Sequence, residues 1–113
     1  MYKPYKTVSI IMSVFNEEKT IQEVLTQLFS IAYINEIIIV DNGSTDNSKQ
    51  LIEKSMLKDD RIKLLTIENN KGLGKAINLA IQNTTCDIVV RQDADLEYDP
   101  NELINLVEII DKG

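Results

Sequence analysis

The sequence contains no histidine and a single cysteine, Cys86. Without histidine, the Ser-His-Asp and Cys-His nucleophilic machineries and His-ligated zinc sites are excluded. A single cysteine cannot form an intrachain disulfide, which is typical of a reducing compartment. Any catalysis would therefore depend on carboxylates, lysine, tyrosine or a hard metal ion.

Long apolar runs and an excess of positive charge are also missing. The N-terminus has no signal-peptide core, and no apolar run approaches the roughly 20 residues that a membrane span needs. A net charge of −6 argues against a nucleic-acid partner or an anionic membrane surface, because both require clustered lysine and arginine. We therefore predict one cytoplasmic domain over residues 1–113, compatible with a peripheral position at the cytoplasmic membrane face.

Short apolar runs alternate with amphipathic stripes along the chain. The segments VSIIMSVF, EIIIVD and CDIVV are typical of buried strands, and RIKLLTIE is typical of a more exposed edge strand. A helix is predicted after each strand. The first opens at Glu17 with Asn16 as N-cap, and the last follows Asp99-Pro100 with Ile110 on its apolar face. The alternation predicts an α/β fold with a parallel sheet and helices on both faces.

Polar clusters follow the predicted strands at the points where they end. They read FNEE, DNGS, ENNKG and RQDAD. In open sheets of this kind, ligands bind beyond the C-terminal strand ends, where the strand order reverses. We therefore expect the four clusters to converge on one crevice.

The acidic cluster after the last strand suits a metal ion. Asp93 and Asp95 are two residues apart, so both carboxylates can reach one hard divalent cation. Glu97 continues the same spacing of two residues. A solvated acidic loop is the plain alternative. A metal-dependent phosphotransferase with Asp93 as nucleophile is another, although Glu97 departs from that motif. Asp99 and Glu102 are interpreted as the start of the next helix.

The remaining clusters each allow a functional and a structural interpretation. Asp41 can accept a hydrogen bond from a base or ribose, or simply belong to a turn, while Asp46 is interpreted as a helix cap. Phe15 can stack on a base or lie in the core.

The Gly72-x-Gly74 stretch is neither a dinucleotide fingerprint nor a P-loop. Its glycines still allow a close backbone approach, and a helix N-terminus attracts phosphate, with Lys71 and Lys75 adding positive charge. The alternative is a glycine-containing loop with solvated lysines.

Taken together, SIIMSVFNEEKTI, IIIVDNGSTDNS, NNKGLGKAINLAI and VVRQDADLEYDP resemble the N-terminal part of family 2 glycosyltransferases, close to the polyprenyl-phosphate sugar synthases. The resemblance covers nearly the whole chain. It implies a Rossmann-like GT-A nucleotide-binding half with a four-stranded, mainly parallel sheet in the order 3-2-1-4. It also implies a nucleotide-diphosphate sugar as donor, and a polyprenyl phosphate or saccharide as acceptor.

The resemblance also assigns residues. Asp93-Ala94-Asp95 matches the family's D-x-D element, which implies Mg²⁺ or Mn²⁺ held by Asp93 and Asp95, with Glu97 as a further ligand. Family members of this kind invert the anomeric centre. The implied nucleotide-sugar site comprises Ser13, Phe15, Glu17, Asp41, Gly72, Lys75, Asp93, Ala94 and Asp95.

Family members continue well past the end of this sequence, with an acceptor region and, in many, the catalytic base. We therefore expect a donor-binding half that binds nucleotide and metal but transfers sugar poorly on its own. Its fourth strand would then expose an outer edge, open to a homo-oligomer or a completing chain. A non-catalytic nucleotide-binding or assembly module of the same fold is the alternative.

Overall fold

The structure is a computed structural model that describes residues 6–94 and 109–111. Three helices alternate with strands in this part of the chain. Their bounds are β1 Val8–Val14, α1 Ile21–Phe29, β2 Glu36–Asn42, α2 Ser48–Met56, β3 Ile62–Ile67, α3 Leu73–Gln82, β4 Ile88–Arg91 and β5 Ile109–Asp111.

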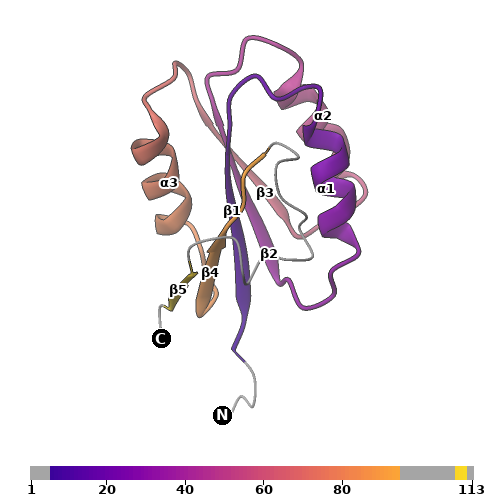
Figure 1. Ribbon diagram of the computed structural model, residues 1–113, viewed down its shortest axis with the longest axis vertical. Coiled ribbons are helices and arrows are strands. Elements are labelled where there is room, and N and C mark those ends of the chain that lie inside the picture. Colours follow the sequence, from indigo (N-terminus) through magenta and orange to yellow (C-terminus); the bar gives the residue numbers. More distant parts are fainter. Residues whose placement is uncertain (1–5, 95–108, 112–113) are drawn as a thin grey trace.

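The strands form one sheet in the order β3-β2-β1-β4-β5 (Figure 1). β1 pairs in parallel with both β2 and β4, and β2 pairs in parallel with β3. This arrangement confirms the predicted order 3-2-1-4. The strand order reverses between β1 and β4, because the chain leaves β1 toward β2 and β3 and later returns to the other side of β1.

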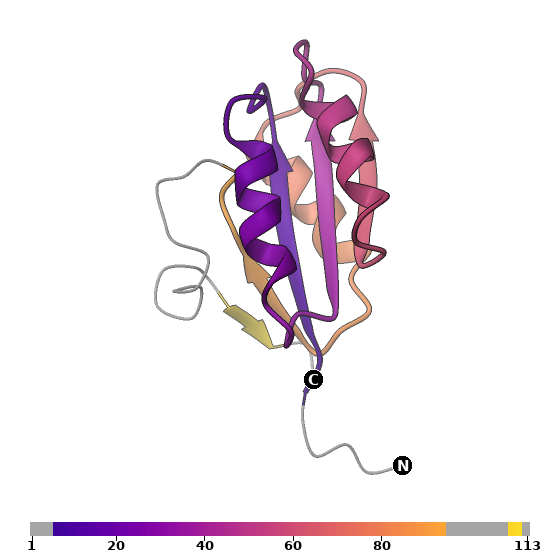
Figure 2. The same cartoon turned by 90° about the vertical axis from the view of Figure 1, so that its right-hand side faces the viewer.

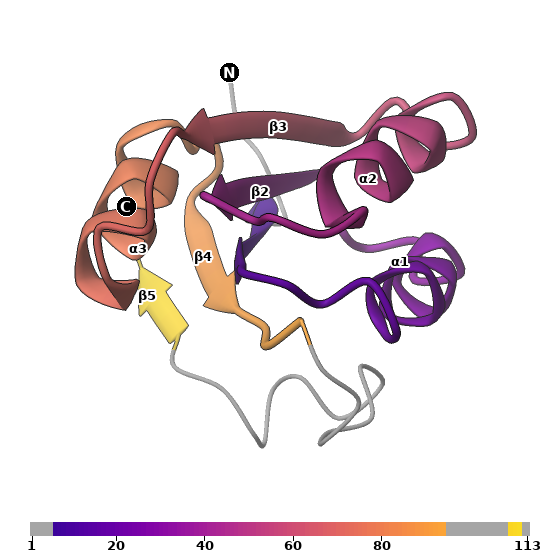
Figure 3. The ribbon, with the colours of Figure 1, turned by 90° about the horizontal axis from the view of Figure 1, so that it is seen from above.

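Helices cover both faces of the sheet, as predicted. Figures 2 and 3 show α1 and α2 on one face and α3 on the other. Two apolar clusters result, because β1 and β2 are buried on both sides and so read as continuous apolar runs. The α1–α2 side contains Ile10, Met12, Val14, Ile21, Val24, Leu25, Leu28, Ile37, Ile39 and Ile52. The α3 side contains Ile11, Ile38, Val40, Ala76, Ala80 and Val89.

Two expectations about the C-terminal segment are wrong. Ile110 lies in β5 rather than on a helix, and β5 pairs antiparallel with β4 from Ile88 to Val90. β5 satisfies its backbone hydrogen-bonding groups by pairing with β4, and the helix-like spacing of apolar residues does not reveal this pairing. The outer edge of β4 is therefore covered along these residues. The rest of the predicted last helix, with Asp99, Leu103, Leu106 and Val107, lies outside the described residues.

The first helix also begins later than predicted. α1 starts at Ile21 with Thr20 at the N-cap position, whereas Asn16 has a φ of 53° and lies in the loop before it. The side-chain amide of Asn16 contacts the loop after β2 and does not cap the helix. No helix in the described part of the chain is long and apolar enough to span a membrane.

Candidate functional site

The C-terminal ends of β1, β2, β3 and β4 lie at the same edge of the sheet (Figure 3). The loops that follow them carry the four polar clusters predicted from the sequence. Hydrogen bonds connect these loops pairwise, from the β1–α1 loop to the β2–α2 loop, from β2 to the β3–α3 loop, and from the start of α1 to the segment after β4. The predicted convergence is thus present among the described residues.

The β1–α1 and β2–α2 loops are held together by a set of hydrogen bonds that we call the loop clasp. It joins residues 16–18 to residues 44–48. The backbone N–H groups of Asn16, Glu17 and Glu18 donate to Ser44 Oγ at 3.0 Å, Ser48 Oγ at 2.8 Å and Asp46 Oδ2 at 3.2 Å, respectively.

Side chains of the first loop return contacts to the second. Asn16 Oδ1 accepts hydrogen bonds from the backbone N–H of Thr45 at 2.8 Å and of Asp46 at 3.3 Å. Glu18 Oε2 accepts one from the N–H of Asn47 at 3.0 Å. The clasp therefore satisfies backbone groups in both loops without using secondary structure.

Asp46 takes part in the clasp and also supports the start of α2, as predicted. Its Oδ1 accepts the backbone N–H of Ser48 at 2.8 Å. Burial would raise the pKa of Asp46, but hydrogen bonds from the side chain and backbone of Ser48 and from the backbone of Glu18 outweigh it and lower the pKa. The carboxylate is therefore fixed in its charged form at the helix N-terminus.

Asp41 and Phe15 lie at the ends of neighbouring strands, on either side of the clasp. Asp41 is only 2% exposed, and its Oδ1 accepts the backbone N–H of Ser44 at 3.3 Å. Its Oδ2 accepts no hydrogen bond from the described part of the chain. Phe15 is 43% exposed, so the core interpretation of this ring is wrong. Within the described residues, the buried Asp41 carboxylate thus keeps one oxygen without a hydrogen bond, close to the exposed ring at the end of the neighbouring strand.

Asn42 connects the end of β2 to the β3–α3 loop. Its buried amide accepts the N–H of Lys71 at 3.1 Å and donates to the carbonyl of Gly72 at 3.2 Å. Gly43 lies against the same loop: a Cβ there would come within 2.5 Å of the backbone nitrogen of Asn70. These contacts fix the position of Gly72, the N-cap residue of α3, which has a φ of 90°. A Cβ added at Gly72 would have no atom within 4 Å.

Two hydrogen bonds fix the backbone of Asp93 and Ala94, the described part of the D-x-D segment. Thr20 Oγ1 donates to the carbonyl of the buried Ala94 at 3.0 Å, and Gln92 Nε2 donates to the carbonyl of Asp93 at 3.2 Å. The Asp93 side chain is 40% exposed, and its nearest cation is Arg91 at 3.8 Å. Its carboxylate is thus available to a ligand while the backbone that carries it is fixed.

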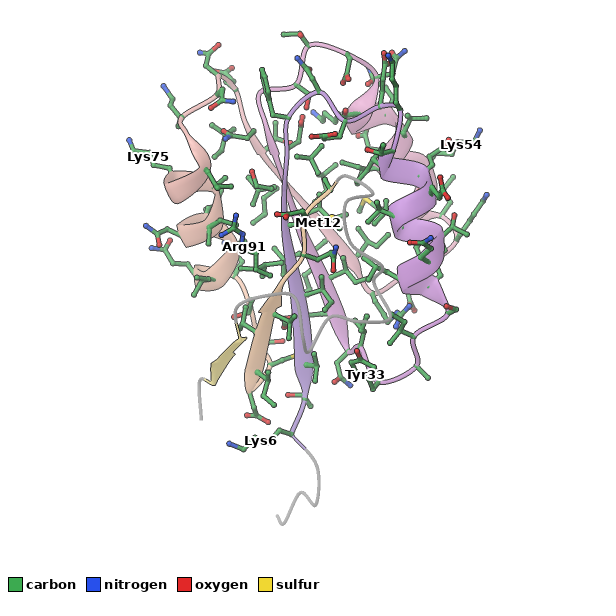
Figure 4. All side chains as sticks on the ribbon, in the orientation of Figure 1. Lys6, Met12, Tyr33, Lys54, Lys75 and Arg91 are labelled. Atoms are coloured by element: carbon green, nitrogen blue, oxygen red, sulfur yellow. The ribbon has the colours of Figure 1, made fainter. Side chains whose placement is uncertain are left out.

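The other predicted residues are placed as follows. Ser13 and Glu17 are half-buried at the end of β1 and in the loop after it. Lys75 is exposed and points outward from α3, away from the sheet, whereas Arg91 lies between β4 and α3 (Figure 4). Lys75 is therefore not brought together with Asp93 or Asp41.

The predicted metal site is only partly described. Asp95 and Glu97 lie outside the described residues. Within residues 6–94 and 109–111, no three acidic, histidine or cysteine side chains lie close enough to hold a metal ion. Asp93 is thus not part of a group of three such side chains in this part of the chain.

The sequence did not predict the residues that organise the loops. Most of them act through neutral side chains, and the partners of Thr20, Asn42, Ser44 and Ser48 are distant in sequence, so no local pattern reveals these contacts. The strongest available signal was the density of Ser, Thr, Asn and Asp after β1 and β2, since these residues favour bonds to backbone groups. The overlooked residues are Thr20, Asn42, Ser44, Ser48, Asn70, Arg91 and Gln92.

A mainly parallel sheet in the order β3-β2-β1-β4-β5, covered by helices on both faces, defines an α/β domain of the Rossmann-like GT-A type. The profile of Glycosyl transferase family 2 matches residues 9–113. The chain therefore belongs to glycosyl transferase family 2, as the resemblance implied.

Individual relatives agree with this assignment. The chain is 37% identical over 113 residues to an undecaprenyl-phosphate 4-deoxy-4-formamido-L-arabinose transferase of Pseudomonas fluorescens, covering 94% of this chain and 33% of that protein. The chain thus spans about a third of the length of this curated relative.

Solved structures of glycosyltransferases share the fold. A mannosyltransferase of Pyrobaculum calidifontis, in complex with GDP-Man and Mn²⁺, superposes with a TM-score of 0.78 at 26% identity, over 88% of this chain and 30% of that one. S. aureus TarS in complex with UDP superposes with a TM-score of 0.73 at 32% identity, over 79% of this chain and 27% of that one.

Proposed function

We propose that this chain supplies the donor and metal site of a glycosyltransferase that transfers a sugar from a nucleotide-diphosphate sugar to a polyprenyl phosphate or a saccharide. In this proposal, residues 1–113 act as one nucleotide-sugar-binding domain. The observation that carries it is the common sheet edge at which Asp41 lies at the end of β2, Phe15 follows β1 and Asp93 follows β4. The acceptor class is supported by the undecaprenyl-phosphate transferase, and the donor class by the GDP-Man and UDP complexes.

The residues would share the nucleotide as follows. The exposed ring of Phe15 stacks on the base, and the unused oxygen of Asp41 accepts a hydrogen bond from a ring N–H of the base. Gly72 leaves room for the diphosphate near the N-terminus of α3, where backbone N–H groups favour anions. Ser13, Glu17, Lys75 and Ala94 stay predicted contacts by family resemblance.

Asp93 has the chemistry that a divalent ion requires. It offers hard carboxylate oxygens at the sheet edge, and Arg91 is too distant to neutralise it fully. We propose that Asp93 and Asp95 hold Mg²⁺ or Mn²⁺, with Glu97 as a further ligand. When bound, the ion offsets the negative charge that develops on the departing diphosphate.

The proposed inverting reaction comes from the family resemblance, since the donor alone does not decide between inversion and retention. An acceptor oxygen attacks the anomeric carbon opposite the diphosphate, the carbon–diphosphate bond breaks, and the configuration inverts. A polyprenyl phosphate is already an anionic nucleophile, whereas a saccharide hydroxyl would require a general base, to which no residue of this chain is assigned. A lipid acceptor would place the domain at the cytoplasmic face of a membrane.

The two alternatives are weaker. The family profile and both kinds of relatives are glycosyltransferases, so no observation favours a phosphotransferase with Asp93 as nucleophile. A non-catalytic nucleotide-binding module would bind the same donors without transfer. Incubation with nucleotide sugars, Mn²⁺ and a polyprenyl phosphate, followed by product detection, separates a module from an enzyme.

A thermal-shift panel tests the binding proposal. UDP, GDP and dTDP are each added with and without Mn²⁺, and a ligand that binds the folded state raises the melting temperature by mass action. We expect one nucleotide to stabilise the chain mainly with Mn²⁺, and Asp95→Ala to remove the metal-dependent part. No shift with any nucleotide would contradict the proposal, and an unchanged shift in Asp95→Ala would contradict the metal site.

A further inference from the structure

The β1–α1 loop bends sharply at Asn16. This residue has a φ of 53°, in the left-handed region that asparagine tolerates better than most residues. Its conformation separates the exposed ring of Phe15 from the N–H groups of residues 16–18, which turn toward the β2–α2 loop. The bend therefore determines how Phe15 is presented at the sheet edge.

The same residue also holds the second loop. Asn16 Oδ1 accepts the N–H groups of Thr45 and Asp46, and its own N–H donates to Ser44 Oγ. The backbone N–H of Ser44 in turn donates to Asp41 Oδ1. A series of hydrogen bonds thus runs from Asn16, the residue after Phe15, through Ser44 to Asp41.

We infer that Asn16 is a positioning residue for nucleoside binding, which fixes the spacing and orientation of Phe15 relative to Asp41 before the nucleotide arrives. This inference rests on the proposed function of the two flanking residues. Preorganised groups bind more tightly because the ligand does not have to order them, and the clasp orders both loops at once. Asn16 itself need not contact the nucleotide.

The chemistry of the amide makes the inference testable. In its contacts within the clasp, the Asn16 side chain acts only as an acceptor, through Oδ1. Aspartate keeps that acceptor and tolerates the same backbone conformation, whereas alanine loses the acceptor and strains the backbone. Glycine relieves the strain but still lacks the acceptor.

Calorimetric titration of UDP, GDP and dTDP with Mn²⁺ into the wild-type chain first identifies the nucleotide that binds best. That nucleotide is then titrated into Asn16→Ala, Asn16→Gly and Asn16→Asp. We expect Kd to rise about tenfold in the alanine and glycine variants and to stay within about threefold of wild type in the aspartate variant. Backbone hydrogen exchange should accelerate at Thr45 and Asp46 in the first two variants and not in the third.

Asn35→Ala is the matched control. Asn35 Oδ1 also holds a backbone N–H, that of Val8 at 2.7 Å, but at the opposite edge of the sheet. Its loss should lower the melting temperature without changing the nucleotide Kd. A Kd in Asn16→Gly that equals that of wild type would overturn the positioning role. Failure of the wild-type chain to bind any nucleotide would overturn the proposed function, and the inference with it.

Discussion

The N-terminal and C-terminal edges of the sheet, meaning the two ends of its parallel strands, differ in how many hydrogen bonds their charged side chains form within the protein. At the N-terminal edge, the buried carboxylate of Glu36 accepts hydrogen bonds from Ser9, from both the backbone and side chain of Thr85, and from Lys63. At the C-terminal edge, Asp41 accepts one hydrogen bond from the described part of the chain, and Asp93 has Arg91 at 3.8 Å.

Arginine residues repeat this contrast. The guanidinium of Arg61, at the N-terminal edge, donates to four backbone carbonyls around the end of α1 and to Asp59. Arg91, at the C-terminal edge, has Asp93 at 3.8 Å. Charges whose hydrogen bonds are all satisfied inside the protein stabilise the fold, whereas charges with unused capacity are available to ligands. The comparison predicts that the first kind controls stability and the second kind controls binding.

The largest stability effect should come from Arg61→Ala. Removing the guanidinium takes one donor from each of four carbonyls and removes the ion pair with Asp59, so the free energy of unfolding should fall by about 3 kcal/mol. Arg91→Ala is the matched variant at the other edge, with an expected change within about 0.5 kcal/mol. Urea unfolding of both variants measures the difference. Equal losses would break the comparison between the edges.

Glu36→Gln should have the next largest effect, and it should depend on pH. Burial would raise the pKa of Glu36, but its hydrogen bonds from Ser9, Thr85 and Lys63 lower it from 4.5 to about 2. Because the folded-state pKa is lowered, the charged form stabilises the protein fully above pH 4.5, and this contribution is lost as the pH falls toward 2.

At pH 7 the glutamine variant should lose about 2 kcal/mol of unfolding free energy, and at pH 3 less than half of that. Urea unfolding at the two pH values is the measurement. Glu53→Gln, at an exposed position of α2, is the control and should change little. A loss at pH 3 as large as that at pH 7 would argue against a lowered pKa for Glu36.

Two glycine variants at the C-terminal edge should change the free energy of unfolding in opposite directions. Gly43→Ala should lower the free energy of unfolding by about 2 kcal/mol, because φ is +80° and the new Cβ meets the backbone of Asn69 and Asn70 within 3.0 Å. Gly74→Ala, in open space in the first turn of α3, should instead stabilise by about 0.5 kcal/mol. Thermal unfolding of both variants checks the opposite signs; destabilisation by both would contradict this account of Gly43.

Asp41→Asn should have only a small effect on stability. The amide keeps an oxygen for the N–H of Ser44, so the free energy of unfolding should change by less than about 1 kcal/mol. This outcome would contrast with Glu36→Gln, although both carboxylates are almost fully buried. Denaturant unfolding at pH 7 provides the value, and a loss as large as that of Glu36→Gln would mean that Asp41 is a structural residue.

The sequence predicted those parts of the fold that depend on periodicity. The apolar runs of β1 and β2 and the stripe from Ile21 to Phe29 predicted buried parallel strands and the packed helix face, whereas the strand order came from the family resemblance. Asn16 was misassigned because its capping preference competes with distant partners in the clasp. β5 was missed because its pairing with β4 is set by tertiary contact rather than by the local pattern.

The candidate site divides in the same way. Asp41, Phe15 and Asp93 were recognisable because strand ends in a parallel sheet share one edge. The outward direction of Lys75 was not, because its position in α3 depends on how that helix packs on the sheet. Arg61 and Glu36 were not singled out, since a satisfied charge has no sequence pattern of its own.

The most direct test compares nucleotide affinity in two carboxylate variants, one from each edge. Calorimetric titration of the best-binding nucleoside diphosphate with Mn²⁺ is carried out on wild type, Asp41→Asn and Glu36→Gln at pH 7, where all three are folded. We predict that Kd rises about tenfold or more in Asp41→Asn and stays within about twofold of wild type in Glu36→Gln. Equal affinities in Asp41→Asn and wild type would contradict the claim that unused charge at the C-terminal edge is the binding site.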